Sequence, residues 1–433
     1  MPGRIAASLA DHTPEVRAAA NDGHHLVIGP GDRLTNGWVA DGLELPDLAE
    51  IRRYRLARIR QQLQSMDYGG VVLMDPMSIR YATDTTNMQI WVMHNAARYC
   101  YVSARDDGPV ILWDYSNCEF LAGHNDQITE VRPAIATIFF TSGSRYKEHS
   151  AKWAAEMIDV IAADAGAKAR IAIDQCHLIG YQVLQAAGIE LGSGQEVMEL
   201  ARAIKSPDEI RAMRCAAHAC QATMAEMRTA LQPGMTERDV WAMLHAGNIR
   251  RGGEWIETQI ISSGPRTNPW FQECSSRVIE PGDLVAYDTD LVGAYGMMID
   301  ISRSWVAGGG KPNAHQRNLH SMAVEQLARN AELLTPGRTF RELTFDSWKP
   351  PTEDYRHYSV QYHGVGQCDE FPSIYFAENW EAVGYDGVVE PGMVFTAESF
   401  IGPRAGGEGM KLEDQYLVTE SGPELLTDFP LDL

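Results

Sequence analysis

Acidic residues inside apolar, strand-like segments constrain this chain more than any other feature of its sequence. Glu398 ends the apolar segment 393–398, and Glu413 stands in the next strand-like segment, 410–414, beyond a glycine-rich loop. A carboxylate buried in a strand is costly unless it is paired. Both glutamates therefore need partners in the folded protein.

A pair of aspartates upstream adds to this acidic pattern. The sequence predicts a β-hairpin that turns around residues 293–296, and with the turn centred on Ala294, Asp288 faces Asp300. Directly opposed side chains have Cβ atoms about 4.5 to 5.5 Å apart. Two ionised carboxylates at that distance repel each other, and a metal ion supplies the missing counter-charge.

Two more residues join the candidate metal site. Asp290 shares a strand face with Asp288 because side chains alternate with a period of two. His363 lies in the stretch Tyr-His-Gly-Val-Gly, whose glycines let the backbone pack close to whatever the imidazole holds. An isolated Asp-x-Asp is more often solvated, and a lone histidine is more often structural. Taken together, the acids and the imidazole favour a metal site with the ligands Asp288, Asp290, Asp300, His363, Glu398 and Glu413.

The chain is long enough for at least two domains, since 433 residues exceed the size of an ordinary single core. Residues 1–45 are rich in Gly, Asp and Ala and predict an irregular arm. Residues 46–200 predict a smaller α/β domain, with helices at 48–63 and 151–164 and strands at 71–74, 110–112 and 171–173.

A helix start marks the second domain, 201–433. Ser206, Pro207 and Glu209 form a capping box that opens a helix through about Leu231. An α+β pattern follows, with strands expected at 255–262, 284–292, 296–307, 393–400 and 411–419 and a helix near 313–333.

Charge and cysteine content exclude several classes of protein. The chain has 58 acidic and 37 basic side chains and a formal charge of -21, which disfavours nucleic acid and anionic membranes and favours a zwitterionic small molecule. Its 7 cysteines are scattered without a C-x-x-C pair, which indicates reduced thiols and a cytoplasmic location. We expect neither a signal peptide nor a membrane span, because no apolar run is long enough.

The acidic motifs resemble those of the pita-bread superfamily, which includes methionine aminopeptidase, prolidase and creatinase. The similarity lies in D-I-S-R-S, H-G-V-G, P-G-M-V-F-T-A-E and K-L-E-D-Q-Y, which occur in that order between residues 205 and 427. It implies a C-terminal pita-bread catalytic domain with two metal ions, preceded by a creatinase-type domain. Asp288 and Asp300 would chelate or bridge the metals, His363 and Glu398 would hold one, and Glu413 would bridge. The spacing to Asp300 leaves open whether Asp288 or Asp290 bridges.

The chain departs from the peptidases where their substrate-binding histidines stand. Trp270 follows a proline where the family has histidine, Asp369-Glu370 replaces another histidine, and Ser359 replaces a third. Loss of these histidines with retention of all metal ligands argues against peptide hydrolysis. The altered motifs resemble the dimethylsulfoniopropionate lyases of the DddP type, which cleave that zwitterion to dimethyl sulfide and acrylate.

This resemblance implies roles for further residues. Asp369 is the candidate general base, and its alternative is a solvated loop acid. A sulfonium cation is attracted to aromatic faces, for which Trp270, Phe271, Tyr358 and Trp91 are available, although each alone is more often ordinary core. Tyr358 is the next candidate base.

Oxygen and nitrogen ligands without a thiolate suit iron or manganese, with zinc less favoured, and the lyase resemblance implies iron. The family also implies a homodimer in which the N-terminal domain lies near the partner's active site. The alternative activity is that of an Xaa-Pro dipeptidase or creatinase-like metallohydrolase, and a non-catalytic binding scaffold is the third hypothesis.

Overall fold

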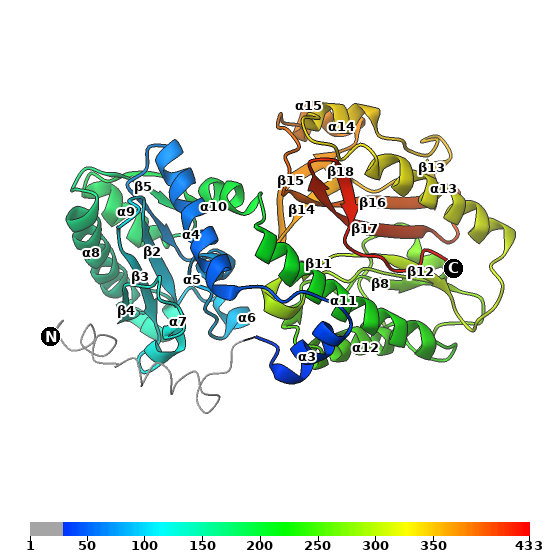
Figure 1. Ribbon diagram of the computed structural model, residues 1–433, viewed down its shortest axis with the longest axis horizontal. Helices are drawn as coiled ribbons and strands as arrows, with labels where there is room; N and C mark the ends of the chain where they lie inside the picture. The colour runs from blue at the N-terminus through cyan, green and yellow to red at the C-terminus, as the bar shows by residue number, and fades with distance from the viewer. Residues whose placement is uncertain (1–28) are drawn as a thin grey trace. The chain divides into compact units, whose positions relative to one another are not determined.

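The computed structural model describes residues 29–433, so the part of the expected N-terminal arm before residue 29 lies outside the described residues. The described chain divides into two compact units (Figure 1). Unit 1 contains residues 47–202, and unit 2 contains residues 29–46 and 203–433. Each unit is described by itself.

Unit 1 is an α/β domain built on a six-stranded mixed sheet with the strand order β4-β3-β2-β1-β5-β6. Its strands are β1 (Gly70–Leu73), β2 (Tyr99–Ser103), β3 (Val110–Asp114), β4 (Glu130–Pro133), β5 (Arg170–Ile173) and β6 (Glu190–Ser193). The strands predicted at 71–74, 110–112 and 171–173 are confirmed as β1, β3 and β5.

Helices cover both faces of this sheet, which explains why its strands β1, β2 and β3 are buried along their whole length. The helices of unit 1 are α4 (Leu48–Ser65), α5 (Pro76–Thr83), α6 (Gln89–Val92), α7 (Phe139–Ser142), α8 (Tyr146–Asp164), α9 (Leu178–Ala186) and α10 (Gly194–Arg202), with 3-10 turns η1 (Glu119–Ala122) and η2 (Gly143–Arg145). Val71 packs in one cluster with side chains of α4 and α10, and its neighbour Val72 packs in the other with α8 and α9.

Unit 2 is an α+β unit in which the strands lie between helices. The strands are β7 (Trp255–Ile256), β8 (Ile261–Ser263), β9 (Leu284–Tyr287), β10 (Leu291–Val292), β11 (Met298–Ile299), β12 (Arg303–Val306), β13 (Tyr355–Arg356), β14 (Val360–Val365), β15 (Asp369–Tyr375), β16 (Val394–Pro403), β17 (Met410–Thr419) and β18 (Gly422–Leu425). They form sheets of order β11-β10-β7, β12-β9-β8 and β15-β14-β16-β17-β18, with β13 also paired to β16.

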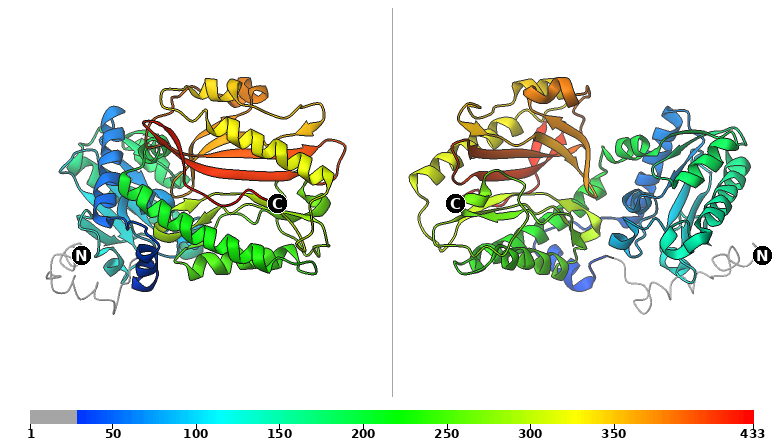
Figure 2. Two further views of the ribbon diagram at one scale, coloured as in Figure 1. Left: turned by 45° about the vertical axis from the view of Figure 1, so that its right-hand side comes forward. Right: turned by 180° about the vertical axis from the view of Figure 1, so that it is seen from behind.

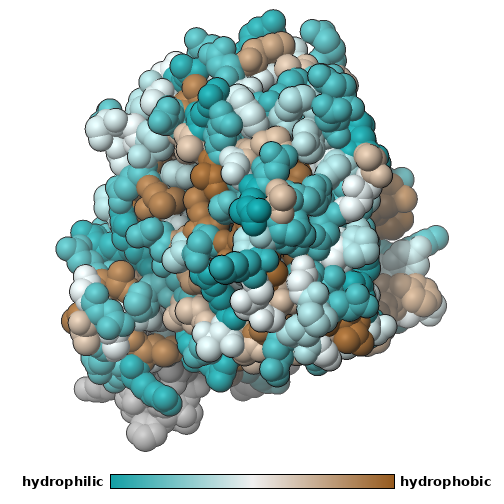
Figure 3. Space-filling model, turned by 90° about the vertical axis from the view of Figure 1, so that its right-hand side faces the viewer, coloured by the Kyte–Doolittle hydropathy of each residue, from teal (hydrophilic) through white to brown (hydrophobic). Residues whose placement is uncertain are grey.

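The helices of unit 2 are α3 (Asp32–Ala40), α11 (Pro207–Ala230), α12 (Glu237–Arg250), α13 (Ala314–Ala331), α14 (Phe340–Asp346) and α15 (Trp380–Val383), with 3-10 turns η3 (Gly264–Thr267), η4 (Ala294–Gly296) and η5 (Ala377–Asn379). Helix α13 packs on β16 and β17, while α11 and α12 lie on the other side of the strands (Figure 2). The face shown in Figure 3 is largely hydrophilic, with apolar side chains gathered near its middle.

The capping box predicted at the start of α11 is confirmed. The Ser206 side chain accepts a hydrogen bond from the Glu209 backbone N–H at 3.1 Å, and the Glu209 carboxylate accepts one from the Ser206 N–H at 2.9 Å. This reciprocal pairing satisfies backbone donors that a helix start otherwise leaves free. The helix ends at Ala230, one residue before the predicted Leu231.

The described part of the expected irregular arm differs from that expectation, because residues 32–40 form helix α3. Trp38 is its buried residue, and it packs against Cys215 and Ala219 of α11. One buried aromatic in nine residues gives no apolar period in the sequence. The helix is therefore stabilised by a tertiary contact that local pattern does not reveal.

The two long strands predicted at 284–292 and 296–307 are each interrupted. The first divides into β9 and β10 and the second into β11 and β12, so residues 288–290 and 300–302 lie outside the ladder. These two interruptions contain Asp288, Asp290 and Asp300. Within residues 29–433 no helix has the length and apolar composition that crossing a membrane requires.

Candidate metal centre

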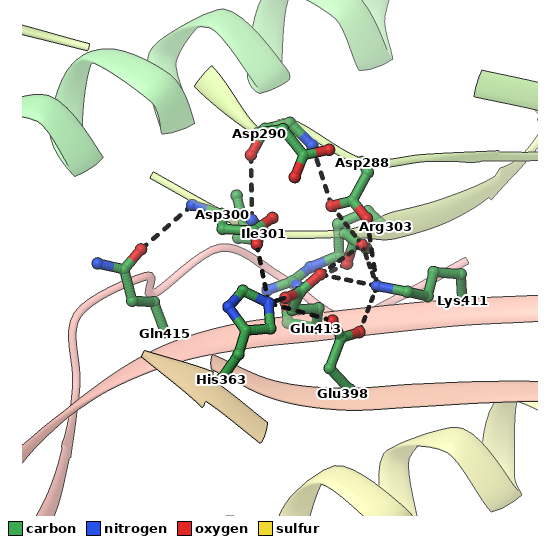
Figure 4. Close-up of polar contacts among 12 residues, drawn as sticks. Asp288, Asp290, Asp300, Ile301, Arg303, His363, Glu398, Lys411, Glu413 and Gln415 are labelled. Carbon is green, nitrogen blue, oxygen red and sulfur yellow. Dashed lines mark hydrogen bonds and ion pairs between the residues drawn. The ribbon is translucent and has the colours of Figure 1, made fainter. Parts of the chain in front are cut away.

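The six predicted metal ligands come together in unit 2 (Figure 4). Two groups of three residues each offer ligand atoms that lie within 4.8 Å of one another. We call them the His363 set, which is Asp300, His363 and Glu413, and the Asp288 set, which is Asp288, Asp290 and Asp300. Asp300 belongs to both sets, and Glu398 lies beside the first, 3.4 Å from the Nε2 atom of His363.

The hairpin register differs from the predicted one. Leu291 pairs with Ile299, and Tyr287 pairs with Arg303, so the turn centres on Tyr295 and not on Ala294. Extended through the gap, this register puts Asp290 opposite Asp300 and Asp288 opposite Ser302. The expectation that Asp288 faces Asp300 directly is therefore wrong: the turn centre lies one residue later, and the position opposite Asp288 is two residues beyond Asp300.

The turn residue itself explains the shift. Tyr295 has a left-handed backbone with φ 60°, an unfavourable conformation for an aromatic residue. Its ring packs on Trp38 of α3, with ring centroids 6.1 Å apart, and this contact holds the residue in place. The hairpin register thus depends on a helix more than two hundred residues away in sequence.

Where the two hairpin strands are interrupted, at residues 288–290 and 300–302, side-chain hydrogen bonds take the place of the backbone ladder. Thr289 donates its hydroxyl hydrogen to the Ile299 carbonyl at 2.9 Å and accepts from the Ile301 N–H at 3.0 Å. Asp290 has a positive φ of 36° and is also held by the Thr258 hydroxyl, which donates to its carboxylate. The break in the ladder lets both Asp288 and Asp290 offer oxygen atoms to one point.

Glu398 and Glu413 oppose each other directly, because they are register partners in β16 and β17. His363 lies on the neighbouring strand β14 and pairs with Thr396, diagonal to Glu398. The period of two then places these three side chains on one face of the sheet. A second close carboxylate pair thus lies in the C-terminal sheet, besides Asp290 and Asp300 in the hairpin.

Lys411 is a buried residue of this cluster that the sequence analysis did not single out. Its ammonium group lies 2.6 Å from Glu398, 2.7 Å from Glu413 and 3.4 Å from Asp288, and it donates to the Ser302 hydroxyl at 2.7 Å. The signal was available in the sequence, since Lys411 precedes Glu413 by two residues in β17 and so shares its face.

Arg303 joins the hairpin to β17 behind the metal ligands. Its guanidinium donates to the Asp414 carboxylate at 2.7 Å and to the Glu413 carbonyl at 2.7 Å, and the residue is 1% exposed. A buried, hydrogen-bonded arginine–carboxylate pair fixes the geometry of both strands. The D-I-S-R-S and K-L-E-D motifs are therefore in direct contact.

Burial and mutual repulsion shift the pKa values of the acids in this cluster. Burial raises the pKa of Asp300 and of Asp290 well above the usual range, and the neighbouring carboxylates raise them further. Burial likewise raises the pKa of Glu398 to about 7, with Glu413 adding to the shift. Burial also acts to raise the pKa of Glu413, but Lys411 and His363 hold it below the usual range.

The residues fit divalent metal ions. Asp300 Oδ1 and Glu413 Oε1 are buried oxygens that accept no hydrogen bond. His363 turns Nε2 toward the carboxylates of Asp300, Glu398 and Glu413, while Nδ1 lies 3.2 Å from the Gly364 carbonyl. Metal-binding histidines commonly use the second ring nitrogen in this way. Cations at the two sets would neutralise carboxylates that otherwise repel one another.

Asp369 lies at the start of β15, beside the imidazole of His363. One of its carboxylate oxygens is 3.5 Å from His363 Nδ1, and 55% of its side chain is exposed. Partial desolvation raises the pKa of Asp369, Glu413 and Glu370 add to the shift, and His363 opposes it. An acid at this place reaches both the metal ligands and solvent.

The four aromatic candidates lie in different surroundings. Trp270 is buried and stacks on Phe400 at 6.2 Å between ring centroids, and Phe271 is exposed with its ring 5.0 Å from that of Tyr358. The Lys411 ammonium lies 5.4 Å from the Trp270 ring centre and 5.5 Å from that of Tyr358, so one cation already faces both rings. The fourth candidate belongs to unit 1.

Trp91, in helix α6 of unit 1, packs near Tyr115 and Phe140 at 6.1 Å between ring centroids in each pair. The structure brings Trp270, Phe271 and Tyr358 together in unit 2. A role of Trp91 toward the metal centre stays a prediction.

The fold and the carboxylate-rich centre define a metalloenzyme of the pita-bread class. The family model of metallopeptidase family M24 matches residues 211–420. The chain is 43% identical to the dimethylsulfoniopropionate lyase DddP of Roseovarius nubinhibens over 98% of its own length and 95% of that protein's. It is 41% identical to the same enzyme of Roseobacter denitrificans over the same shares of the two chains. The chain belongs to the DddP family of dimethylsulfoniopropionate lyases.

Solved structures support the fold. An Xaa-Pro dipeptidase from Bacillus anthracis superposes with a TM-score of 0.70 over 88% of this chain and 98% of the dipeptidase, at 22% identity. This similarity confirms the predicted pita-bread domain with a preceding smaller domain.

Proposed function

We propose that this chain is a carbon–sulfur lyase that cleaves dimethylsulfoniopropionate to dimethyl sulfide and acrylate. The observation that carries the proposal is the similarity to the two lyases along nearly the whole chain. Asp369, Glu370 and Trp270 standing where peptidases have histidines support it against the alternative of a dipeptidase or creatinase-like hydrolase.

Asp369 acts as the general base of a β-elimination. It takes a proton from the carbon next to the substrate carboxylate, and the electron pair of that C–H bond forms the new double bond. The bond from the next carbon to sulfur breaks, and its electrons leave with neutral dimethyl sulfide. Because half of the Asp369 side chain is exposed, the captured proton passes to solvent. Its raised pKa makes the carboxylate a stronger base than an ordinary aspartate.

The metal ligands hold the centre at which the substrate carboxylate binds. Asp300, which is common to both sets, would hold the metal ions together with Asp288, Asp290, His363, Glu398 and Glu413. When bound, the metal ions supply positive charge that spreads the negative charge developing on the substrate. Carboxylate oxygens with one imidazole suit iron, with manganese or zinc as alternatives.

The aromatic side chains receive the sulfonium end of the substrate. Phe271 and Tyr358 form a pair of which Phe271 is 59% exposed, and Trp270 lies deeper, against Phe400. A cation over an aromatic face gains roughly 0.5 to 2 kcal/mol. The Lys411 ammonium already faces Trp270 and Tyr358, and Trp270 also stacks on Phe400, which directs the sulfonium to the exposed ring of Phe271 beside Tyr358.

The proposal also includes the oligomeric state and the cellular location of the enzyme. The enzyme is a cytoplasmic homodimer in which Trp91 and its domain lie near the partner's active site. Seven free cysteines support a reducing compartment. Size-exclusion chromatography with light scattering tests the dimer, and a mass of one chain, 48.0 kDa, would contradict it.

One assay tests the activity. Purified protein loaded with Fe²⁺ is given dimethylsulfoniopropionate or, separately, an Xaa-Pro dipeptide, with headspace gas chromatography and amine release as readouts. We expect dimethyl sulfide and acrylate in equal amounts and no amine. Amine release without dimethyl sulfide would establish the hydrolase instead.

A further inference from the structure

Lys205 and Glu370 form a buried ion pair in unit 2 that the proposed reaction does not use. The Lys205 ammonium lies 3.1 Å from Oε2 of Glu370, and the two side chains are 3% and 1% exposed. The two residues are 165 positions apart in the chain. Lys205 directly precedes the capping box of α11, and Glu370 directly follows Asp369 in β15. The pair therefore joins the start of a helix to the strand that carries the candidate base.

The backbone of Lys205 is held in place on both sides. Its N–H donates to the Gly392 carbonyl at 2.9 Å, and the Gly392 N–H donates to the Val418 carbonyl of β17 at 2.9 Å. The residue after it, Ser206, is the N-cap of α11, a helix of 24 residues. The Lys205 ammonium is thus presented from a rigid support, which includes the strand that carries Glu413.

The carboxylate of Glu370 holds the turn between β14 and β15. Its Oε1 atom accepts a hydrogen bond from the Gln367 N–H at 2.9 Å, while Oε2 accepts one from Lys205. The carboxylate also packs against Gly366, where a side-chain carbon would lie 2.1 Å from Oε2. The turn therefore wraps around this carboxylate, and a displacement of Glu370 would displace the turn.

Asp369 and Glu370 point to opposite sides of β15, because side chains alternate along a strand. Glu370 is buried, whereas the Asp369 side chain is partly exposed and lies beside the His363 imidazole. In the ladder, Val365 pairs with Asp369 and Gly364 with Glu370. A fixed Glu370 on the inner side therefore fixes the direction in which Asp369 leaves the strand on the outer side.

Stability alone does not account for a buried ion pair. The removal of two charges from water costs about as much as their attraction returns, and apolar side chains of similar volume are often as stable. The ion pair supplies direction, because charge-assisted hydrogen bonds are short and strong. Direction matters at Asp369, since a general base must stand within hydrogen-bond reach of the proton that it takes.

We infer that Lys205 and Glu370 are positioning residues that aim the Asp369 carboxylate at the carbon from which it takes the proton. Both are buried and act through the turn at 366–368, without contact with the substrate. Because Asp369 is the base in the proposed function, this role rests on that function.

The test removes both charges together. In Lys205→Met/Glu370→Gln, called the pair variant, no buried charge is left without its partner. We expect kcat to fall between about tenfold and a hundredfold, because a misplacement of about 1 Å at a reacting group costs up to about a hundredfold. KM, metal content and melting temperature should stay near wild type. A pair that served only the fold would leave kcat unchanged in a variant with the wild-type melting temperature.

Addition of Asp369→Asn shows whether the pair acts through the base. Effects of independent sites on kcat multiply, whereas effects that pass through one shared group do not. The pair variant should therefore lower kcat no further in an Asp369→Asn background. A further fall by the same factor as in wild type would overturn the inference, and so would a pair variant with the wild-type kcat.

The matched control is Lys152→Met/Glu148→Gln, the same two changes at an exposed ion pair of α8. It should leave kcat unchanged. If the pair variant does not fold, Glu370→Gln alone takes its place: its amide oxygen still accepts from the Gln367 N–H, but its amide nitrogen does not accept from Lys205. It should show a smaller fall in kcat with unchanged KM, and the wild-type kcat in this variant would reject the pair.

Hydrogen exchange of the backbone N–H groups at 366–370 gives a readout that does not depend on catalysis. These groups should exchange faster in the pair variant, because the acceptor of the Gln367 N–H is no longer held by Lys205. Faster exchange in a protein that forms no dimethyl sulfide would keep the role of the pair in the turn and reject the lyase. Unchanged exchange in a protein that forms dimethyl sulfide would reject the pair and leave the lyase intact.

Discussion

A carboxylate oxygen of Asp369 lies 3.5 Å from the Nδ1 atom of His363, on the side of the imidazole opposite the metal-ligand carboxylates. This single contact allows two roles. Asp369 is the base that takes the substrate proton, or it orients His363 as a ligand, as carboxylates beside metal-binding histidines do. The two roles predict different responses to one substitution.

Asp369→Asn keeps the shape and deletes the base. We expect kcat to fall at least about a hundredfold, the usual effect of removing a positioned acid or base, with metal content near wild type by elemental analysis. Asp386→Asn, an exposed acid outside the site, is the matched control. If the Asn variant loses metal in proportion to activity, Asp369 orients His363. If it retains more than about a tenth of wild-type turnover with full metal, Tyr358 becomes the next candidate base.

Asp300 and Asp290 should differ in how much metal their loss removes. Asp300 belongs to both sets, so Asp300→Ala should leave less than one metal ion per chain, whereas Asp290→Ala should retain the ion beside His363. The rise in melting temperature on metal addition should disappear in the first variant, because a ligand that binds only the folded state stabilises it. Elemental analysis and thermal scans with and without chelator measure both effects. Unchanged metal in Asp300→Ala would show that the site is wrong.

Trp270→Ala should separate substrate binding from metal binding. The ring is buried against Phe400 and lies 5.4 Å from the Lys411 ammonium. Loss of one aromatic face for the sulfonium corresponds to roughly 0.5 to 2 kcal/mol, so KM should rise by up to about thirtyfold. Metal content should stay unchanged. A variant that lost metal but kept its KM would show that Trp270 only supports Lys411.

Glu237 supports the segment that carries Trp270. Its buried carboxylate accepts hydrogen bonds from the backbone N–H groups of Ser263 and Ser275, each at 2.8 Å, and pairs with Arg266. Glu237→Gln leaves some of these donors unpaired, and we expect a loss of about 2 kcal/mol in the free energy of unfolding at pH 7. Urea denaturation measures this loss, and Glu420→Gln, at an exposed position, is the control.

The pH dependence of that loss has a definite sign. Burial acts to raise the pKa of Glu237, but Ser275, Ser263 and Arg266 together hold it below the usual range. Stability from a lowered pKa is fully present above the unfolded value of about 4.3 and is lost as the pH falls through the folded value. The difference between wild type and Glu237→Gln should therefore shrink below about pH 4. A difference that stays constant down to pH 3 would contradict this account.

Local signals in the sequence predicted much of this protein. The capping box at Ser206 depends on residues within one helical turn, and the apolar strands of unit 1 depend on burial of both sheet faces. The identities of the candidate ligands follow from carboxylates in apolar strands. Such features are expressed in short stretches of chain, because propensity, capping and alternation act between near neighbours.

The hairpin register was decided by tertiary structure. A shift of one residue in the turn moves every side chain to a new partner. Tyr295 sets that turn through its contact with Trp38 in α3, a helix whose single buried residue leaves no periodic signal. The sequence therefore predicted which aspartates gather, and the remote contact decided that Asp290, and not Asp288, lies opposite Asp300.

The surroundings of Lys411 were decided in the same way. Period two in β17 places it beside Glu413, but only the pairing of β16 with β17 and the gap in the hairpin bring Glu398, Asp288 and Ser302 around its ammonium group. Sequence by itself determined that this protein has an acid-rich centre on a pita-bread scaffold. Tertiary structure decided which oxygens face the lysine and which face His363, because long-range packing fixes distances between strands that local sequence does not encode.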